Sequence, residues 1–118
     1  MHSTGIVRQF LEVFSENGRE SELEELVSED AIDSNPVFFQ PPGRAGVAYK
    51  LRIFRAAYPE ARSTIEEIEA TSEGILARWR TELAPGGPVH LFTAQFTIKN
   101  NKIAAVSTIA DASNQGQY

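Results

Sequence analysis

The sequence predicts a single α+β domain in which three N-terminal helices cover a curved, mostly antiparallel sheet and enclose an apolar pocket. Apolar residues recur at helical spacing up to Pro59, and beyond it the spacing changes to the alternation typical of strands. The links between the predicted strands are short, so consecutive strands must run antiparallel. Helices followed by strands is the α+β order, and a sheet with one apolar face needs helices packed against that face.

Three segments are predicted to form the helices. The first covers residues 4–16, and the Asn-Gly pair at 17–18 supplies the left-handed residue that ends it. A capping box at 21–24 opens a second, short helix. The third begins at about Ala45 and is stopped by the next proline, which cannot continue the helical hydrogen bonds. Lys50, at the margin of the third helix, is expected to reach water.

A short extended stretch at 31–35 and four longer strands are predicted after and between these helices. Pro36 ends the short stretch, and a proline-rich loop with two aromatic residues follows over 37–43. Turns rich in glycine, proline or asparagine separate the four longer strands, which are expected at residues 62–71, 74–83, 88–98 and 102–111. No internal repeat interrupts this order, so residues 1–118 are expected to form one domain.

Composition and charge exclude several classes of protein. Of 118 residues, 42% are hydrophobic and 23% are charged, which is typical of a folded domain and not of a disordered chain. The formal net charge is −5 and no stripe of Lys or Arg follows any segment, so no nucleic-acid partner is expected. There is no cysteine and no apolar run long enough for a signal peptide or a membrane span, so we expect a cytoplasmic protein without a membrane partner.

Several short pieces of the chain, taken in order, carry a resemblance to a known family. They are Val7-Arg8-Gln9-Phe10-Leu11, Leu23-Glu24-Glu25-Leu26-Val27 with Ala31-Ile32-Asp33, Pro41-Pro42-Gly43-Arg44-Ala45-Gly46, Phe54-Arg55-Ala56-Ala57-Tyr58-Pro59, Ser63-Thr64-Ile65-Glu66-Glu67-Ile68, Leu76-Ala77-Arg78-Trp79, and Lys102-Ile103 leading to Asp111. Over about residues 5–111 the chain resembles the SnoaL-like family, the polyketide-cyclase branch of the nuclear-transport-factor-two-like cone superfamily. The resemblance implies the cone-shaped fold. It implies less about chemistry, since the superfamily includes cyclases, isomerases, dehydratases, hydrolases and proteins without known activity.

The chain departs from the family pattern at three places. Family members often carry a histidine just after the aspartate that matches Asp33, where this chain has a serine. Tryptophans are usual in the last strand, at positions that match Ser107 and Ala110 here. The segment between Trp79 and His90 is also shorter than usual. These departures leave the substrate open.

A symmetric hairpin around the turn at 100–101 would fix how the last two strands align. Lys99 would face Lys102, and side chains of successive pairs two residues apart would share one face of the sheet. That face would hold Ile98 opposite Ile103, Phe96 opposite Ala105, Ala94 opposite Ser107, Phe92 opposite Ile109, and His90 opposite Asp111. Opposed residues have Cβ atoms about 4.5–5.5 Å apart, close enough for an imidazole to meet a carboxylate. A one-residue bulge would destroy this pairing.

We therefore hypothesise that His90 and Asp111 form a catalytic dyad in which Asp111 exchanges protons with the substrate. Proton abstraction next to a carbonyl needs a positioned base, and a group in a low-dielectric cavity has its pKa moved toward that task. By the resemblance, Asp111 also matches the acid/base aspartate at the end of the last strand in SnoaL-like cyclases. The alternative is a solvated carboxylate at a strand end for Asp111 and a half-exposed histidine at a strand edge for His90.

A further set of side chains is expected to contact the bound molecule. These candidates are Phe14, Asp33, Asn35, Tyr49, Trp79, Phe92 and Ser107. Each has another interpretation: Trp79 can be a core residue, Asp33 and Asn35 can serve the turn before Pro36, and Tyr49 can pack on its helix. His2 and His90 are the only histidines and there is no thiol, so neither a metal nor another cofactor is expected.

These observations favour cofactor-free acid/base chemistry on a small apolar or aromatic carbonyl compound, similar to the cyclisation or isomerisation reactions of SnoaL-like enzymes. One alternative is a non-catalytic domain of the same fold that binds a small ligand or dimerises. A ketosteroid-isomerase-like activity is a third interpretation, weakened because the required tyrosine and protonated acid cannot be placed together. Because many relatives pair through their sheets, a homodimer is expected.

Overall fold

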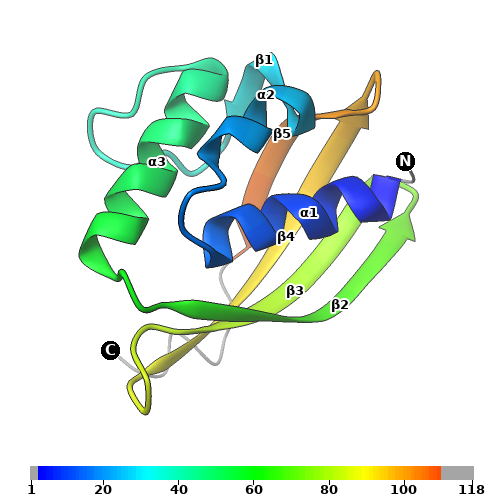
Figure 1. The fold of residues 1–118 in the computed structure, drawn as a ribbon. Helices are drawn as coiled ribbons and strands as arrows, with labels where there is room; N and C mark the ends of the chain where they lie inside the picture. The colour runs from blue at the N-terminus through cyan, green and yellow to red at the C-terminus, as the bar shows by residue number, and fades with distance from the viewer. Residues whose placement is uncertain (1–2, 110–118) are drawn as a thin grey trace.

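Five strands form one curved sheet in a computed structural model, which describes residues 3–109 (Figure 1). In the order in which they lie side by side, the strands are β1 (Val27–Asp33), β5 (Lys102–Ile109), β4 (Val89–Lys99), β3 (Gly74–Glu82) and β2 (Arg62–Thr71). β1 runs parallel to β5, and every other neighbouring pair is antiparallel. The predicted α+β architecture with a mostly antiparallel sheet is confirmed.

Three helices lie on one face of this sheet (Figure 1). They are α1 (Ser3–Ser15), α2 (Leu23–Leu26), which follows a short 3-10 turn η1 (Glu20–Glu22), and α3 (Gly43–Ala57). α1 crosses the sheet on the side of β2 and β3, and α3 packs beside β1. Among the described residues, no helix is both long and apolar enough to cross a membrane.

The core fills the space between the helices and the concave face of the sheet. Phe96, at the centre of β4, is completely buried, and its ring meets Phe10 of α1 edge-on with centroids 5.8 Å apart. Val7 and Val13 of α1 are equally buried. The helical spacing of apolar residues in α1 predicts a buried face, and that face is buried against the sheet.

A bulge between β4 and β5 changes the alignment predicted for these strands. The turn at Asn100 and Asn101 is as predicted: both have positive φ values, 51° and 61°, and Lys99 faces Lys102. Ile98 also pairs with Ile103 as expected. Beyond that point Ala104 has no partner, so every later pair is shifted by one residue.

The shift reverses which residues of β5 face the helices. Phe96 pairs with Val106 and Ala94 with Thr108, where the symmetric hairpin predicted Ala105 and Ser107. Val106 and Thr108 therefore lie on the concave side, and Ser107 lies exposed on the outer face. The predicted pairing was wrong from Phe96 onward.

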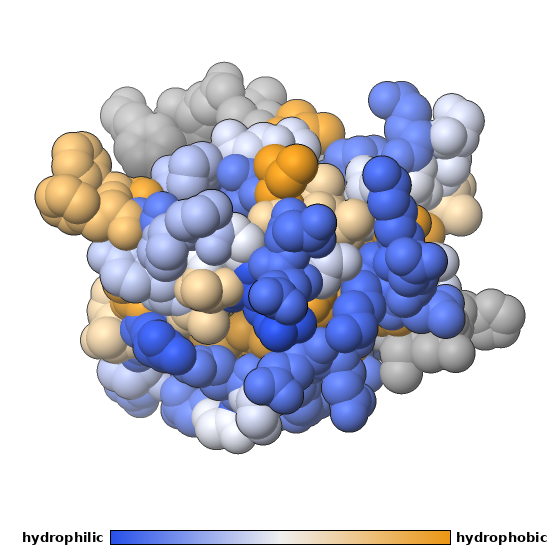
Figure 2. Space-filling model, turned by 90° about the horizontal axis from the view of Figure 1, so that it is seen from above, coloured by the Kyte–Doolittle hydropathy of each residue, from blue (hydrophilic) through white to orange (hydrophobic). Residues whose placement is uncertain are grey.

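The loop between β1 and α3 projects two aromatic side chains from the molecule. Phe38 and Phe39 are 82% and 85% exposed, and their rings meet edge-on with centroids 4.9 Å apart. Figure 2 shows an apolar projection on the side of the molecule where this loop lies. Both aromatic residues of this proline-rich loop therefore face water.

Candidate functional site

A cavity of about 360 Å³ lies between the sheet and helices α1 and α3. Most of its wall is apolar, made by Phe10, Leu11 and Phe14 of α1, Val47 and Phe54 of α3, and Trp79, Phe92, Phe96 and Val106 of the sheet. Its volume is at the lower end of the range for small-molecule sites. The cavity suits a compact, mainly apolar molecule.

Two stacked rings form part of the sheet side of the cavity. Trp79 of β3 and Phe92 of β4 are paired across the strands, and their rings stack with centroids 5.5 Å apart and an interplanar angle of 18°. On the helix side, Phe14 packs against Phe10 at 5.0 Å. The structure thus brings together three of the side chains predicted to contact a ligand, Phe14, Trp79 and Phe92, in one aromatic wall.

The charged end of the cavity is organised around Asp33, at the end of β1. Its side chain is only 7% exposed, and its Oδ2 lies 3.0 Å from the Nζ atom of Lys50 on α3. The same oxygen accepts a hydrogen bond from Gln40 Nε2 at 3.1 Å, and Oδ1 accepts one from the backbone N–H of Asn35 at 2.9 Å. Both carboxylate oxygens are therefore occupied by donors from the protein.

These contacts keep Asp33 ionised. Burial alone raises the pKa of its carboxyl group, but the hydrogen bonds from Asn35, Gln40 and Lys50, with the positive charge of Lys50, outweigh that effect and hold the pKa below its ordinary value. A carboxylate whose pKa is lowered and whose two oxygens already accept hydrogen bonds from the protein is a poor base. Asp33 is better suited to fixing the position of Lys50.

Asn35 joins this end of the cavity to the neighbouring strand. Its Oδ1 atom accepts a hydrogen bond from the backbone N–H of Thr108 at 2.8 Å, and its backbone carbonyl accepts one from Lys50 Nζ at 2.9 Å. The backbone N–H of Ser34 donates to the carbonyl of Val106 at 3.0 Å. β1 and β5 are thus tied together at the point where Asn35, Lys50 and Thr108 line the cavity.

A second polar position on the cavity wall is neutral. The hydroxyl groups of Ser63 on β2 and Thr81 on β3 are 2.9 Å apart, and Thr81 is 2% exposed. The backbone N–H of Ser63 donates to the hydroxyl of Ser15 at 2.9 Å. Because these hydroxyls bond each other, they satisfy a polar pair inside an otherwise apolar wall.

The comparisons with known proteins identify the family. The family model described as the SnoaL-like domain matches residues 7–106. The chain belongs to the SnoaL-like family. This confirms the resemblance inferred from the sequence. Among curated proteins, none has a significantly similar sequence.

Solved structures with the same fold include a candidate polyketide cyclase from Bacillus cereus ATCC 10987. It is 20% identical, with a TM-score of 0.75 over 95% of this chain and 76% of that one. A SnoaL-like polyketide cyclase from Agrobacterium tumefaciens is 18% identical, with a TM-score of 0.73 over 99% and 98% of the two chains. A de novo designed protein with a curved β-sheet is 16% identical, with a TM-score of 0.72 over 94% and 86%. Likeness at such identities shows the fold alone, and a fold does not specify the chemistry.

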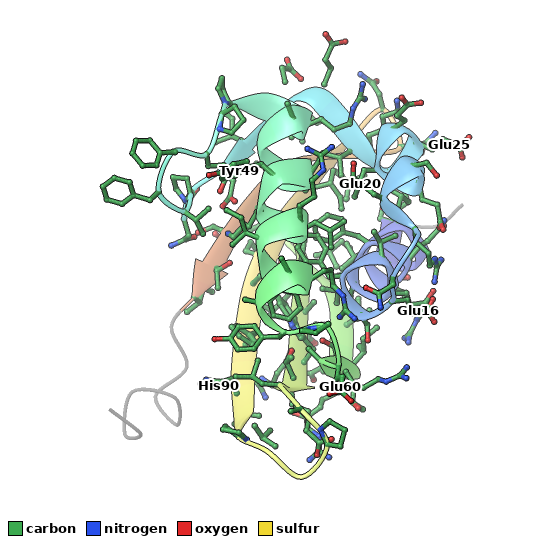
Figure 3. All side chains as sticks on the ribbon, turned by 60° about the vertical axis from the view of Figure 1, so that its left-hand side comes forward. Glu16, Glu20, Glu25, Tyr49, Glu60 and His90 are labelled. Carbon is green, nitrogen blue, oxygen red and sulfur yellow. The ribbon has the colours of Figure 1, made fainter. Side chains whose placement is uncertain are left out.

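The other predicted site residues that the structure describes, His90, Tyr49 and Ser107, are not part of the cavity lining. His90 is opposite Thr81 near the start of β4, its ring tilted against Phe92 with centroids 6.5 Å apart, and it is not part of the cavity lining (Figure 3). Tyr49 lies toward the other end of the molecule, where its hydroxyl is 3.4 Å from the carbonyl oxygen of Phe38 (Figure 3). Ser107 lies on the outer face, opposite Gln95.

Asp111 lies outside the described residues, so its partnership with His90 stays a prediction. The pairing from which that partnership was derived is wrong, because the bulge at Ala104 shifts the strands by one residue. Asp111 keeps its support from the SnoaL-like resemblance alone. The dyad no longer has support from strand alignment.

Sequence reasoning missed two residues of the charged end, Lys50 and Thr108. Lys50 was expected at the water-exposed margin of its helix, yet it is three residues after Val47 and four before Phe54, both of which line the cavity. Residues at these spacings share a helix face, so the signal was present. Thr108 carried no such signal, because its position in the cavity depends on the bulge.

Proposed function

We propose that this SnoaL-like protein is a cofactor-free acid/base catalyst of the cyclase or isomerase type, acting on a small, largely apolar carbonyl compound held in the cavity. The observation that carries the proposal is the asymmetry of the cavity. Aromatic and aliphatic side chains form most of the wall, and the charged groups Asp33 and Lys50 are gathered at one end. A ligand with an apolar body and one carbonyl group would be oriented by such a wall.

The apolar body of the compound would lie against Trp79, Phe92 and Phe14, with the carbonyl oxygen toward Lys50. An ammonium group next to that oxygen stabilises the negative charge that develops when a proton leaves the neighbouring carbon. Lys50 is suited to this role because the ion pair with Asp33 and the bond to the Asn35 carbonyl hold its Nζ atom in place. Positioning before the reaction is what makes such stabilisation effective.

The base in this proposal is Asp111, because the family resemblance matches it to the acid/base aspartate of SnoaL-like cyclases. Its carboxylate would take the proton from the carbon next to the carbonyl, the C–H electron pair would form a carbon–carbon double bond, and the carbonyl would become an enolate oxygen. The enolate carbon would then attack a second carbonyl of the same molecule, closing a ring and leaving an alkoxide to be protonated. Alternatively, in an enolate conjugated with a further double bond, the far carbon would take the proton and the double bond would move. Asp111 would return the proton in both cases.

Proton exchange tests this proposal without knowledge of the natural substrate. The test compound is 2-tetralone in D₂O, and the readout is loss of the NMR signal of the protons next to its carbonyl. We expect the wild-type protein to accelerate exchange and Asp111→Asn to lose at least about 100-fold of that acceleration. Asp30→Asn is the matched control, since Asp30 is an exposed residue of β1 outside this cavity, and it should keep full activity. Equal rates for wild type and Asp111→Asn would contradict the proposal.

Non-catalytic binding in the same cavity is the second candidate function. Two observations favour it: both oxygens of Asp33 are occupied by donors, and His90 is not part of the cavity lining. The rate of proton exchange in bound 2-tetralone distinguishes the two functions. A protein that binds 2-tetralone in the cavity but leaves its proton exchange at the rate of the buffer is a binding protein.

A further inference from the structure

At the charged end of the cavity, one of the three N–H groups of the Lys50 ammonium has no acceptor within residues 3–109. An ammonium group carries three N–H donors and no acceptor. Two acceptors of the protein lie within reach of Nζ, namely Asp33 Oδ2 at 3.0 Å and the Asn35 carbonyl oxygen at 2.9 Å. Within residues 3–109 no third acceptor contacts Nζ, and Lys50 lines the cavity. One charged donor is therefore available to a ligand.

Asn35 and Thr108 add neutral donors beside it. The oxygen of the Asn35 amide is identified by its bond to the Thr108 N–H at 2.8 Å, so the amide nitrogen points elsewhere. In the described part of the chain, neither that nitrogen nor the Thr108 hydroxyl has a hydrogen-bond partner, and both residues line the cavity. Asn35 is an exposed residue, and no fully buried polar atom of the partly buried residues in 3–109, Thr108 among them, lacks a partner, so both donors lie where solvent or a ligand can reach them.

Most acceptor positions at the same end are already bonded to the protein. Asp33 accepts one hydrogen bond at Oδ1 and two at Oδ2, all from the protein. The neutral hydroxyls of Ser63 and Thr81 bond each other. A ligand that donates a hydrogen bond would compete with the protein donors that already hold both oxygens of Asp33, whereas one that accepts hydrogen bonds would meet up to three donors, one of them charged.

We propose that this donor cluster, made by Lys50, Asn35 and Thr108, binds an oxygen anion on an otherwise apolar molecule. The anion is a carboxylate or the enolate of a 1,3-dicarbonyl compound, in which the negative charge is shared between two oxygens that can each accept hydrogen bonds. The inference rests on the proposed function and deepens it by naming the substrate class. A charge-assisted hydrogen bond from Lys50 gives the preference for the anion over a neutral ketone.

Binding of three small probes of similar size tests the inference. They are 4-phenylbutanoate, which is a carboxylate, the enolate of 1-phenylbutane-1,3-dione, and the neutral ketone 1-phenylbutan-1-one. Affinities are measured by isothermal titration calorimetry at a pH above the pKa of the dione. We expect at least one anion to bind about tenfold or more tightly than the ketone. Tight binding of the carboxylate alone or of the enolate alone identifies which source of the anion the site accepts.

Three variants show whether the donor cluster causes the preference. Asn35→Asp keeps the acceptor for the Thr108 N–H and replaces the amide donor by a negative oxygen, Lys50→Met removes the charged donor at similar length, and Thr108→Val removes the hydroxyl. We expect Asn35→Asp and Lys50→Met to lower anion affinity about tenfold or more and to change ketone affinity little. Thr108→Val should have a smaller effect in the same direction. Lys99→Met, at the exposed end of β4, is the matched control and should bind like wild type.

Several results would overturn the inference: equal affinity for all three probes, no binding of either anion, or an anion preference that survives Asn35→Asp. If Lys50→Met fails to fold, Asn35→Asp still decides, because Asn35 is exposed and its bond to β5 is retained. The outcome is separable from that of the proton-exchange experiment. Anion binding without accelerated exchange contradicts only the catalytic function, and accelerated exchange without anion preference contradicts only the donor cluster.

Discussion

Lys50 of α3 and Asp33 of β1 form an ion pair of 3.0 Å that joins the helix layer to the edge of the sheet. Removing the carboxylate leaves the Lys50 ammonium without its counter-charge, and leaves the Gln40 amide and the Asn35 backbone N–H without their acceptor. We expect Asp33→Ala to lower the free energy of unfolding by about 2–3 kcal/mol, the cost of leaving a half-buried charge and a polar donor unpaired. Urea denaturation of wild type and Asp33→Ala measures this loss in the free energy of unfolding. Asp30→Ala, at an exposed position of the same strand, should cost less than about 0.5 kcal/mol, and a similar loss in both variants would contradict the role given to the pair.

The lowered pKa of Asp33 predicts how stability depends on pH. Because folding favours the ionised form, its contribution is complete above the unfolded-state pKa of about 3.9 and is lost as pH falls through the lower pKa of the folded state. Wild type should therefore lose more stability than Asp33→Asn when the pH is lowered below about 4. The pKa of Glu22, lowered to about 2 by hydrogen bonds from Arg19 and Gln9, acts in the same direction in both proteins and cancels. If the urea midpoints of wild type and Asp33→Asn fall in parallel as the pH is lowered, the prediction is wrong.

The alignment of β4 and β5 can be tested with two neighbouring substitutions. Val106 lines the cavity and Ser107 lies exposed on the outer face. Val106→Phe should fill part of the cavity and weaken binding of 2-tetralone about tenfold or more, since extra volume inside competes with the ligand. Ser107→Phe should leave binding unchanged. The symmetric hairpin predicts the opposite result, so a calorimetric titration of the two variants decides between the alignments.

The outer face of the sheet supports the expectation of a homodimer. Residues 91–97 of β4 and 105–109 of β5 include no charged residue on either face, and Ile32 of the neighbouring β1 is 64% exposed. On β3 and β2 the outer face carries charged residues such as Arg78. We expect light scattering after size-exclusion chromatography to give a dimer, and Thr93→Arg to shift it toward monomer by placing charges in the contact. Thr64→Arg, on the charged side, is the control. A monomeric wild type would rule the dimer out.

The sequence was sufficient to predict the fold because the signals for it are local. Helical spacing of apolar residues, alternation in the strands and the Asn100-Asn101 turn each agree with the structure. β1 is the exception, since it begins at Val27 directly after α2, where the sequence predicted an extended stretch only from Ala31. An edge strand with charged residues facing water shows little alternation, so its start could not be predicted.

The site was harder to predict because it depends on one residue of strand alignment. Ala104 and Ala105 are both small and fit either face of a sheet, so their order gives no sign that one of them is left unpaired. That bulge decides whether Ser107 or Thr108 faces the cavity. Lys50 was detectable from its spacing to Val47 and Phe54, whereas its partnership with Asp33 depends on how α3 packs beside β1.

Trp79 is the only tryptophan of the chain, and its ring stacks on Phe92 in the cavity wall. Any change in indole emission when a compound is added therefore comes from a single known position. Collections of unlabelled compounds can be screened by intrinsic fluorescence, and the same signal reports loss of the wall on denaturation. The molecule carries its own optical probe next to the space a ligand would occupy.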